Sequence, residues 1–242
     1  MSNGWDLSNP DHYEKWKLPM VEVFETVEGE GSGAGFPTIF VRVFHCNLRC
    51  TWCDTPYSYA PAKPEYEATV KEIAAFAHRF ASRRICFTGG EPLMHREKSA
   101  ALLKALALPQ KIDDVHIETN GAIDLIPFHD LRQQEPWGEK VRFVMDYKLP
   151  ASGEADKMIH RNFNCLKERD EVKFVIGNQT DFLKAVDVIK SYHKQGQVLF
   201  SPVFEKLSPR KLVEWVLAHS LSNVRVSLQL HKFIWDPAER GV

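Results

Sequence analysis

The chain has 242 residues, 44% of them apolar, so it is long enough to bury a full core. Its 31 Lys and Arg residues nearly balance 32 Asp and Glu residues, which argues against nucleic acid or a membrane surface as the main partner. No apolar run approaches the roughly 20 residues of a membrane span. We expect a single domain over residues 1–242, in which the polar residues 1–20 form an N-terminal extension and not a secretory signal.

Strand and helix patterns alternate along the chain. Apolar, β-branched segments predict strands at residues 38–44, 84–90, 114–121, 141–150, 171–177, 197–204 and 223–233. Helical periodicity predicts helices at residues 69–83, 98–108, 180–196 and 208–220, the first of them opened by a capping box. Residues 56–68 and 150–164 are predicted to be irregular loops. This order predicts an α/β fold with parallel strands and outer helices, curved or closed into a barrel.

Polar side chains gather where the predicted strands end. They are Cys46, Thr88, Thr119, Asp146, Gln229 and His231. In folds with parallel strands, the carboxyl ends of the strands hold the active site. We therefore expect one site assembled from several strands, with a cysteine-rich loop after an early strand.

The segment CNLRCTWCDT, residues 46–55, holds three of the five cysteines in a C-x3-C-x2-C spacing. An odd, clustered set of cysteines indicates a reducing compartment, here the cytoplasm, and a metal or redox site. A structural zinc ion needs four ligands, so His45, Cys86 or Cys165 would have to complete it. A [4Fe–4S] cluster on three thiolates instead leaves one iron open to a cofactor or substrate. Incidental thiols are the remaining interpretation.

The cysteine spacing, with Trp52 just before the last cysteine, resembles the radical S-adenosylmethionine (SAM) superfamily. The glycine turn TGGEP at residues 88–92 strengthens the resemblance. What it implies is a [4Fe–4S] cluster on Cys46, Cys50 and Cys53 whose open iron is chelated by SAM. An electron passed through the cluster then releases a 5′-deoxyadenosyl radical.

Flanking motifs at residues 26–42, 53–55, 88–92, 117–121 and 228–232 together resemble the 7-carboxy-7-deazaguanine synthase family. The implied reaction is the ring contraction of 6-carboxy-5,6,7,8-tetrahydropterin to 7-carboxy-7-deazaguanine with release of ammonia, in queuosine or other deazapurine biosynthesis. The resemblance also implies an incomplete (β/α)6 barrel, a homodimer, regenerated SAM, and an external electron donor of the flavodoxin or ferredoxin type.

The resemblance implies three sets of site residues. SAM is contacted by Trp52, Cys53, Asp54, Gly90, Thr119, Asn120, Asp146, Tyr147 and Lys148. The pterin is contacted by Val27, Glu28, Gly29, Glu30, Arg42, Thr88, Gln229, His231 and the terminal Val242. The third set is a Mg²⁺ ion on the Thr55 hydroxyl, with the substrate completing its octahedron.

Elementary chemistry agrees with several of these roles. Arg42 can bind the substrate carboxylate through a bidentate fork. Glu28 and Glu30 can accept hydrogen bonds from the amino and N–H edge of a pterin. Gln229 and His231 are expected to share one face of the last strand.

Two other functions remain open from the sequence. A glycyl-radical activating enzyme would have a similar length and cysteine motif, but its substrate is a protein. A non-catalytic zinc-binding module would use the same cysteines without chemistry. Clustered polar residues at strand ends favour a small substrate in a pocket over either alternative.

Overall fold

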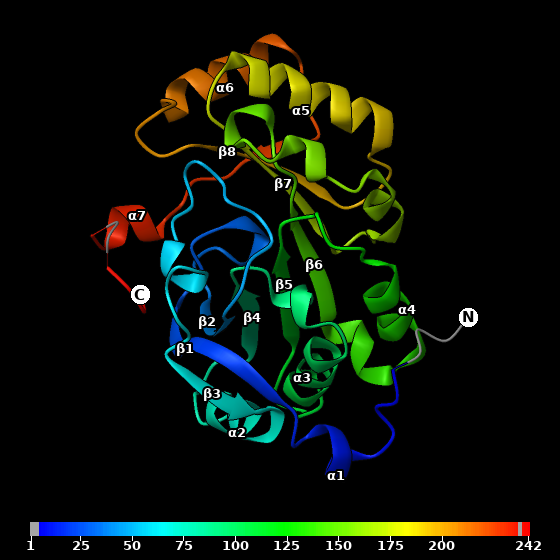
Figure 1. Cartoon of the computed structure of the whole chain (residues 1–242). Helices are drawn as coiled ribbons and strands as arrows, with labels where there is room; N and C mark the ends of the chain where they lie inside the picture. The colour runs from blue at the N-terminus through cyan, green and yellow to red at the C-terminus, as the bar shows by residue number, and fades with distance from the viewer. Residues whose placement is uncertain (1–4, 237–238) are drawn as a thin grey trace.

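One nine-stranded sheet forms the centre of the molecule in the computed structural model, which describes residues 5–236 and 239–242 (Figure 1). Its strands are β1 (Lys17–Val27), β2 (Pro37–Val43), β3 (Tyr66–Thr69), β4 (Arg84–Gly89), β5 (Asp114–Thr119), β6 (Val141–Asp146), β7 (Glu171–Ile176), β8 (Gln197–Pro202) and β9 (Val224–Val226). Their order is β3-β1-β2-β4-β5-β6-β7-β8-β9. From β2 through β4 to β9 the neighbours pair parallel, while β1 pairs antiparallel with β2 and β3.

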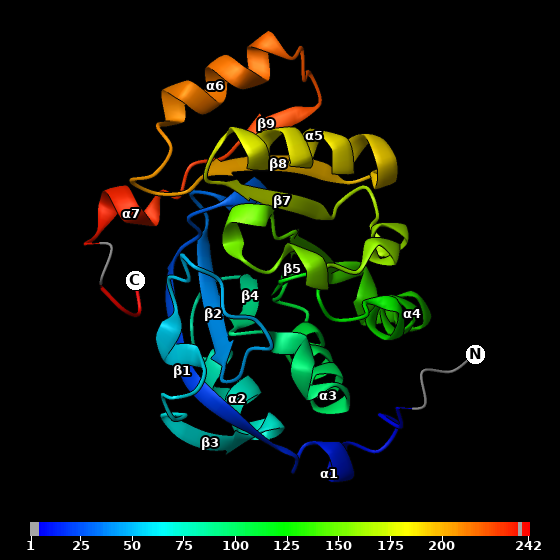
Figure 2. The ribbon, with the colours of Figure 1, turned by 45° about the horizontal axis from the view of Figure 1, so that its top comes forward.

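Helices cover the outside of this sheet. They are α1 (Pro10–Tyr13), α2 (Val70–Ala77), α3 (Glu97–Ala107), α4 (Ile126–Gln134), α5 (Gln179–Tyr192), α6 (Pro209–Ala218) and α7 (His231–Ile234). Figure 2 shows α5 lying over β7 and β8, with α6 further out beside β9. The sheet curves but stays open between β3 and β9, which confirms the predicted incomplete barrel with outer helices. Within the described residues, no helix has the length and apolar character that crossing a membrane requires.

The predicted strands form because their apolar side chains fill the space between sheet and helices. Phe87, Phe143, Phe174 and Phe200, from the parallel strands β4, β6, β7 and β8, are completely buried. Near-continuous apolar runs of this kind are typical of parallel strands covered by helices. The capping box at the start of α2 is also confirmed, because the Thr69 hydroxyl accepts from the N–H of the third helical residue and that residue's carboxylate accepts from the Thr69 N–H.

The end of the chain differs from the prediction. β9 covers only Val224–Val226, and His231 begins the short helix α7. Gln229 and His231 therefore do not share a strand face as expected. The reason is a hydrogen bond from the Leu230 N–H to the Gly29 carbonyl (2.9 Å), which turns the chain away from the sheet and toward the loop that follows β1.

Five labelled elements were not predicted: α1, β1, β3, α4 and α7. β1 begins at Lys17, inside the residues 1–20 expected to form an extension, because residues 17–20 pair with β3. β3 begins at Tyr66, inside the loop predicted at 56–68. The predicted loop at 150–164 contains three short 3-10 helices, Pro150–Ser152, Ala155–Lys157 and His160–Cys165. α1, β3 and α7 have four residues each, too few for a periodic pattern to mark them.

A loop between β1 and β2, residues 28–33, connects distant parts of the open sheet, and we call it the bridging loop. The Gly31 N–H donates to the Ser227 hydroxyl beyond β9 (3.2 Å), and the Ser32 N–H donates to Glu171 at the start of β7 (3.1 Å). Gly31 adopts a φ of 67°, which favours glycine, and a Cβ there would collide with the Glu171 carboxylate. The loop thus lies inside the barrel.

Candidate active site

A cavity of about 430 Å³ opens where the parallel strands end. It is lined by nearly all the residues predicted for the site: Val27, Glu28, Gly29, Glu30, Arg42, Cys46, Cys50, Trp52, Cys53, Asp54, Thr55, Thr88, Gly90, Thr119, Asn120, Asp146, Lys148, Gln229, His231 and Val242. Residues up to 215 positions apart in sequence therefore face one space. The volume lies in the range of pockets for small molecules.

Tyr147 is the predicted site residue whose side chain does not line this cavity. Its ring is buried between Phe163 and Phe174, and its hydroxyl lies 2.9 Å from His160 Nε2. Because successive side chains of a strand point to opposite faces, Asp146 and Lys148 face the cavity while Tyr147 faces the core. Only the backbone of Tyr147 is left for a role at the site.

The cysteine loop, residues 46–53, follows β2 and carries three free, half-buried cysteines. Burial raises the pKa of Cys46 and raises that of Cys50 to about 11, so both thiols are neutral near pH 7. Among the described residues, Cys46 Sγ accepts two long hydrogen bonds, from the Leu48 N–H (3.4 Å) and the Asn120 amide (3.8 Å). Binding to iron would ionise these thiols and give each a stronger partner.

The geometry favours a cluster over a single zinc ion. A tetrahedral zinc with bonds of about 2.3 Å needs sulfur atoms less than about 4 Å apart. Among the described residues, the group whose ligand atoms all lie within 4.8 Å is Glu28, Cys86 and His116, and not the three cysteines of the loop. Cys165, another candidate for a fourth ligand, lies in the core beside Arg132. The three sulfur atoms of the loop are therefore spaced more widely than one tetrahedral zinc ion requires, which favours a cluster.

Gly90 lets the end of β4 approach the cysteine loop closely. A Cβ at this position would lie 2.7 Å from the Cys46 Cβ, so no other residue fits. The next residue, Glu91, accepts hydrogen bonds from the Thr119 hydroxyl (2.9 Å) and the Asn120 N–H (2.7 Å). This buried carboxylate fixes two predicted SAM residues beside the cysteines.

Arg42 and Thr55 also line the cavity. Arg42 Nε donates to Glu22 at 2.9 Å and Nη1 makes a long hydrogen bond to the Gly89 carbonyl (3.5 Å), so the remaining N–H groups of the terminal nitrogens are available to a ligand. Thr55 precedes a 3-10 turn, Pro56–Ser58, but its side chain makes no capping hydrogen bond there. Its hydroxyl lies 3.8 Å from the Cys53 sulfur, and Thr55 lines the cavity next to the cysteine loop.

The cavity is also lined by the carboxylates of Glu28, Glu30 and Glu118, which we call the carboxylate wall. Lys173 of β7 lies among them, with Nζ 2.8 Å from Glu30, 3.8 Å from Asp146 and 4.0 Å from Glu118. Burial acts to raise the pKa of Glu30, but Lys173 and Gln229 lower it to about 2. Glu30 is therefore ionised and fixed before any ligand binds.

Gly29 allows His231 to lie close to the carboxylate wall. A Cβ on Gly29 would collide with the His231 ring, whose Cγ would lie only 3.1 Å away. Gln229 donates to Glu30 at 2.7 Å from the same segment. The motifs at residues 26–42 and 228–232 thus lie side by side. The second motif does so from the segment that leads into α7, and not from a strand as predicted.

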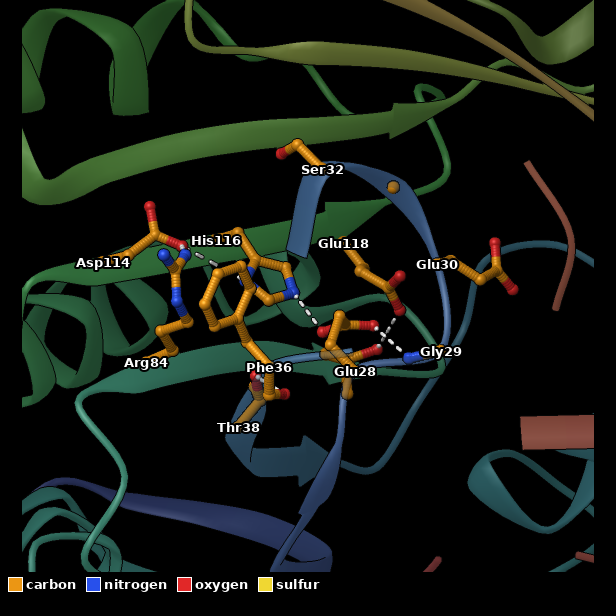
Figure 3. A network of polar contacts seen from close by, with 12 residues as sticks. Glu28, Gly29, Glu30, Ser32, Phe36, Thr38, Arg84, Asp114, His116 and Glu118 are labelled. Atoms are coloured by element: carbon orange, nitrogen blue, oxygen red, sulfur yellow. Dashed lines mark hydrogen bonds and ion pairs between the residues drawn. The ribbon is translucent and has the colours of Figure 1, made fainter. Parts of the chain in front are cut away.

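Behind the wall lies a chain of buried charges, drawn in part in Figure 3. The His116 ring points at Glu28, with Nε2 2.9 Å from Oε2, and its other nitrogen lies 3.7 Å from Asp114. Asp114 in turn accepts from Arg142 at 3.0 Å, and Arg142 also binds Glu171 at 2.7 Å. These side chains are at most 6% exposed. Negative and positive groups alternate from Glu171 to the cavity.

Sequence reasoning missed Lys173, Glu118 and His116. A signal was present for Lys173, since a lysine in the centre of the apolar strand EVKFVIG needs a buried partner. Glu118 stands inside the motif IETNG, where it accepts from the Thr88 hydroxyl at 3.2 Å. No local pattern marks His116, because its partner Glu28 lies on a distant loop.

Comparison with known proteins agrees with this geometry. Residues 41–217 match the family model of the radical SAM superfamily. The 7-carboxy-7-deazaguanine synthase of Clostridium acetobutylicum is 35% identical over 92% of this chain and 98% of that protein. The enzyme of that name from Leptospira interrogans is 36% identical over 93% and 98%. The crystal structure of QueE from Escherichia coli covers 93% of this chain and 100% of that one, with a TM-score of 0.70 at 20% identity, and it supports the fold alone.

The superfamily match includes the three cysteines and the carboxyl ends of β2 and of β4 to β8, and the two relatives cover more than nine-tenths of this chain. This chain belongs to the radical SAM superfamily and, within it, to the 7-carboxy-7-deazaguanine synthase family.

Proposed function

We propose that this protein converts 6-carboxy-5,6,7,8-tetrahydropterin into 7-carboxy-7-deazaguanine and ammonia, as a radical SAM lyase of queuosine or other deazapurine biosynthesis. The observation that carries the proposal is the pairing of two different walls on one cavity: three thiols that fit a [4Fe–4S] cluster, and a carboxylate wall for a ligand rich in N–H donors. The substrate and the two products balance in atoms, so the ring contraction needs no net oxidant.

Cys46, Cys50 and Cys53 would hold the cluster, and its remaining iron would bind SAM. When bound, the two groups supply a 5′-deoxyadenosyl radical that removes a hydrogen atom from the substrate. Thr119 and Asn120, fixed by Glu91, together with Gly90 and Asp146, line the cavity beside the cysteines and would orient SAM. Trp52, Asp54, Lys148 and the backbone of Tyr147 complete that side.

The residues opposite would bind the pterin. The terminal nitrogens of Arg42 suit its carboxylate, while Glu28 and Glu30 suit the amino and N–H edge. Thr88, Gln229 and His231 border the same space, and Val27, Gly29 and Val242 close it. The Thr55 hydroxyl would give Mg²⁺ one protein oxygen, and the substrate would give further ones.

Other properties follow from the same resemblance. We infer a single domain, a homodimer, a cytoplasmic location, and a flavodoxin or ferredoxin as external electron donor. The reducing compartment is supported by five free cysteines among the described residues. Analytical ultracentrifugation of the cluster-loaded protein tests the dimer independently of activity.

The decisive experiment is anaerobic incubation of the reconstituted protein with SAM, a reductant and 6-carboxytetrahydropterin, followed by mass spectrometry. We expect a product lighter than the substrate by one ammonia. A glycyl-radical activating enzyme would instead cleave SAM without consuming the pterin. A zinc module would bind zinc and never gain the visible absorption of an iron–sulfur cluster. Either result would overturn the proposal.

A further inference from the structure

His116 lies behind the cavity and belongs to no role described so far. It lies within β5, its side chain is 3% exposed, and Nε2 is 2.9 Å from the Glu28 carboxylate. Among the described residues, His116 Nε2 is the basic side-chain nitrogen that lies within 4 Å of the Glu28 carboxylate. Glu28 itself lines the cavity and is 5% exposed at its side chain. The two residues therefore connect the charge chain to the ligand space.

The pair must be charged to be stable in this place. A buried carboxylate without a partner is costly, and it would take up a proton instead. Burial acts to lower the pKa of His116, yet that pKa stands well above its ordinary value because of Cys86, Glu28 and Asp114 around the ring. Burial raises the pKa of the neighbouring Cys86 to about 12, so this thiol is neutral and the carboxylates of Glu28 and Asp114 are the acidic groups that face the ring.

The protonation state of Glu28 decides which ligand edge it can recognise. An ionised carboxylate only accepts hydrogen bonds, while a neutral carboxyl group also donates one. The 2-amino group and ring N–H of a pterin are donors, and the corresponding oxo analogue presents an acceptor. A cation fixed behind Glu28 thus favours the amino compound over the oxo compound.

We propose that His116 is a positioning residue for substrate recognition: it keeps Glu28 ionised and aimed at the cavity, so that the site selects a pterin with a 2-amino edge. Asp114, anchored by Arg142 at 3.0 Å, holds the far side of the ring in place. The inference deepens the proposed function and rests on it. It assigns specificity to a residue that never touches the substrate.

Cys86 raises a competing interpretation, because the ligand atoms of Glu28, Cys86 and His116 all lie within 4.8 Å. A metal ion shared by the three, with bonds of about 2.0–2.1 Å, would hold Glu28 and His116 about 3 Å apart, close to their present 2.9 Å. A direct ion pair accounts for the same contact without a metal. The two interpretations differ in what removal of the thiol should do.

The test measures equilibrium binding to the cluster-loaded protein without reductant, for 6-carboxytetrahydropterin, its 2-oxo analogue and SAM. We expect His116→Leu to weaken pterin binding about ten- to hundredfold and to leave SAM affinity unchanged. This factor corresponds to the loss of the charge-assisted hydrogen bond between the pterin and the Glu28 carboxylate. Preference for the amino over the oxo compound should shrink in this variant. Adding Glu28→Gln to His116→Leu should restore much of the affinity, because a neutral amide oxygen accepts without a counter-charge.

Cys86→Ser is the matched control and should bind both compounds as the wild type does. Loss of affinity in Cys86→Ser, together with a stoichiometric metal other than iron in the wild type, would mean a metal site and overturn the inference. Failure of Glu28→Gln to improve His116→Leu would mean a purely structural role. If His116→Leu does not fold, as judged by SAM affinity, the same comparison is made with His116→Gln.

Wild-type behaviour separates this inference from the proposed function. Conversion of the pterin by the wild type, with unchanged affinity and selectivity in His116→Leu, would sink the inference alone. Absence of pterin binding and turnover in the wild type would overturn the proposed function first.

Discussion

The cysteine loop and the carboxylate wall face the same cavity, but their polar groups are satisfied in different ways. Glu30 has Lys173 at 2.8 Å and Gln229 at 2.7 Å, both within the protein. The hydrogen bonds that Cys46 accepts from the described part of the chain are, in contrast, 3.4 and 3.8 Å long, and its thiol is neutral. The polar groups of the wall are therefore held in place by other residues of the protein. Those of the cysteine loop would gain their main partners from a bound cluster. Substitutions should consequently lower stability on one side and cluster binding on the other.

The largest effect is expected from the cysteine loop. Ala at Cys46, Cys50 or Cys53 should abolish the cluster and all activity, because one missing thiolate leaves an iron without its ligand. Iron and sulfide content and the visible spectrum after anaerobic reconstitution measure this loss.

Cys165→Ala, a substitution in the core, is the control and should keep the iron content of the wild type. Wild-type iron in any of the loop variants would contradict the cluster assignment. A large loss of stability in the metal-free loop variants would contradict the comparison itself.

The second effect concerns the stability of the carboxylate wall. Lys173→Met should lower the free energy of unfolding by about 3–5 kcal/mol, because it leaves Glu30 buried without its cation. Urea unfolding of the metal-free protein measures the change. Lys184→Met, which removes an exposed lysine 3.4 Å from Asp187, should cost less than about 1 kcal/mol. Equal losses in the two variants would show that the wall is not held by its charges.

Arg42 should affect binding more than stability. Arg42→Ala should weaken binding of the pterin by about 2–5 kcal/mol and leave SAM binding unchanged, since a buried charge pair with the substrate is lost. Arg42→Lys should also fail, because a point charge cannot replace the planar fork. Isothermal titration under anaerobic conditions measures both affinities. A fall in SAM affinity with unchanged pterin affinity would contradict the role of Arg42 as the ligand of the substrate carboxylate.

Acid should weaken the wall through Glu30. Its pKa in the folded protein is about 2, below the ordinary value of 4.5, so its contribution to stability is full above 4.5 and is lost as the pH falls toward 2. Unfolding free energies of wild type and Glu30→Gln, measured between about pH 6 and pH 3, should therefore converge at the acid end. A constant difference across that range would argue against the lowered pKa.

The smallest effect is expected at Thr55. Mg²⁺ should accelerate turnover of the wild type, and Thr55→Ala should keep the cluster and SAM binding while losing that acceleration. Product formation with and without added Mg²⁺, after chelation, measures the response in both proteins. A normal response in Thr55→Ala would exclude the hydroxyl as the ligand, and no response in either protein would exclude the magnesium site.

Most of the parallel sheet was predictable because its strands are continuous apolar runs and its helices have regular periodicity. The cysteine loop was predictable because its three ligands are local in sequence. The wall was only partly predictable, since its charges pair across strands: Lys173 with Glu30, and His116 with Glu28. The alternation in NVRVSLQLHKF favoured a long strand, but the contact of Leu230 with Gly29 ends the strand at Val226. Such tertiary contacts have no local signal.

The bridging loop has a consequence for how the protein is made. Its hydrogen bonds join Gly31 to Ser227 and Glu30 to Gln229, over separations of 196 and 199 residues. Closing loops of this length is entropically costly, so contacts of this kind form after the local ones. During synthesis, Glu28 and Glu30 can meet His116 and Lys173 before Ser227 and Gln229 have left the ribosome. We therefore expect the parallel sheet to fold first and the substrate pocket to be completed only when residues 227–231 are available.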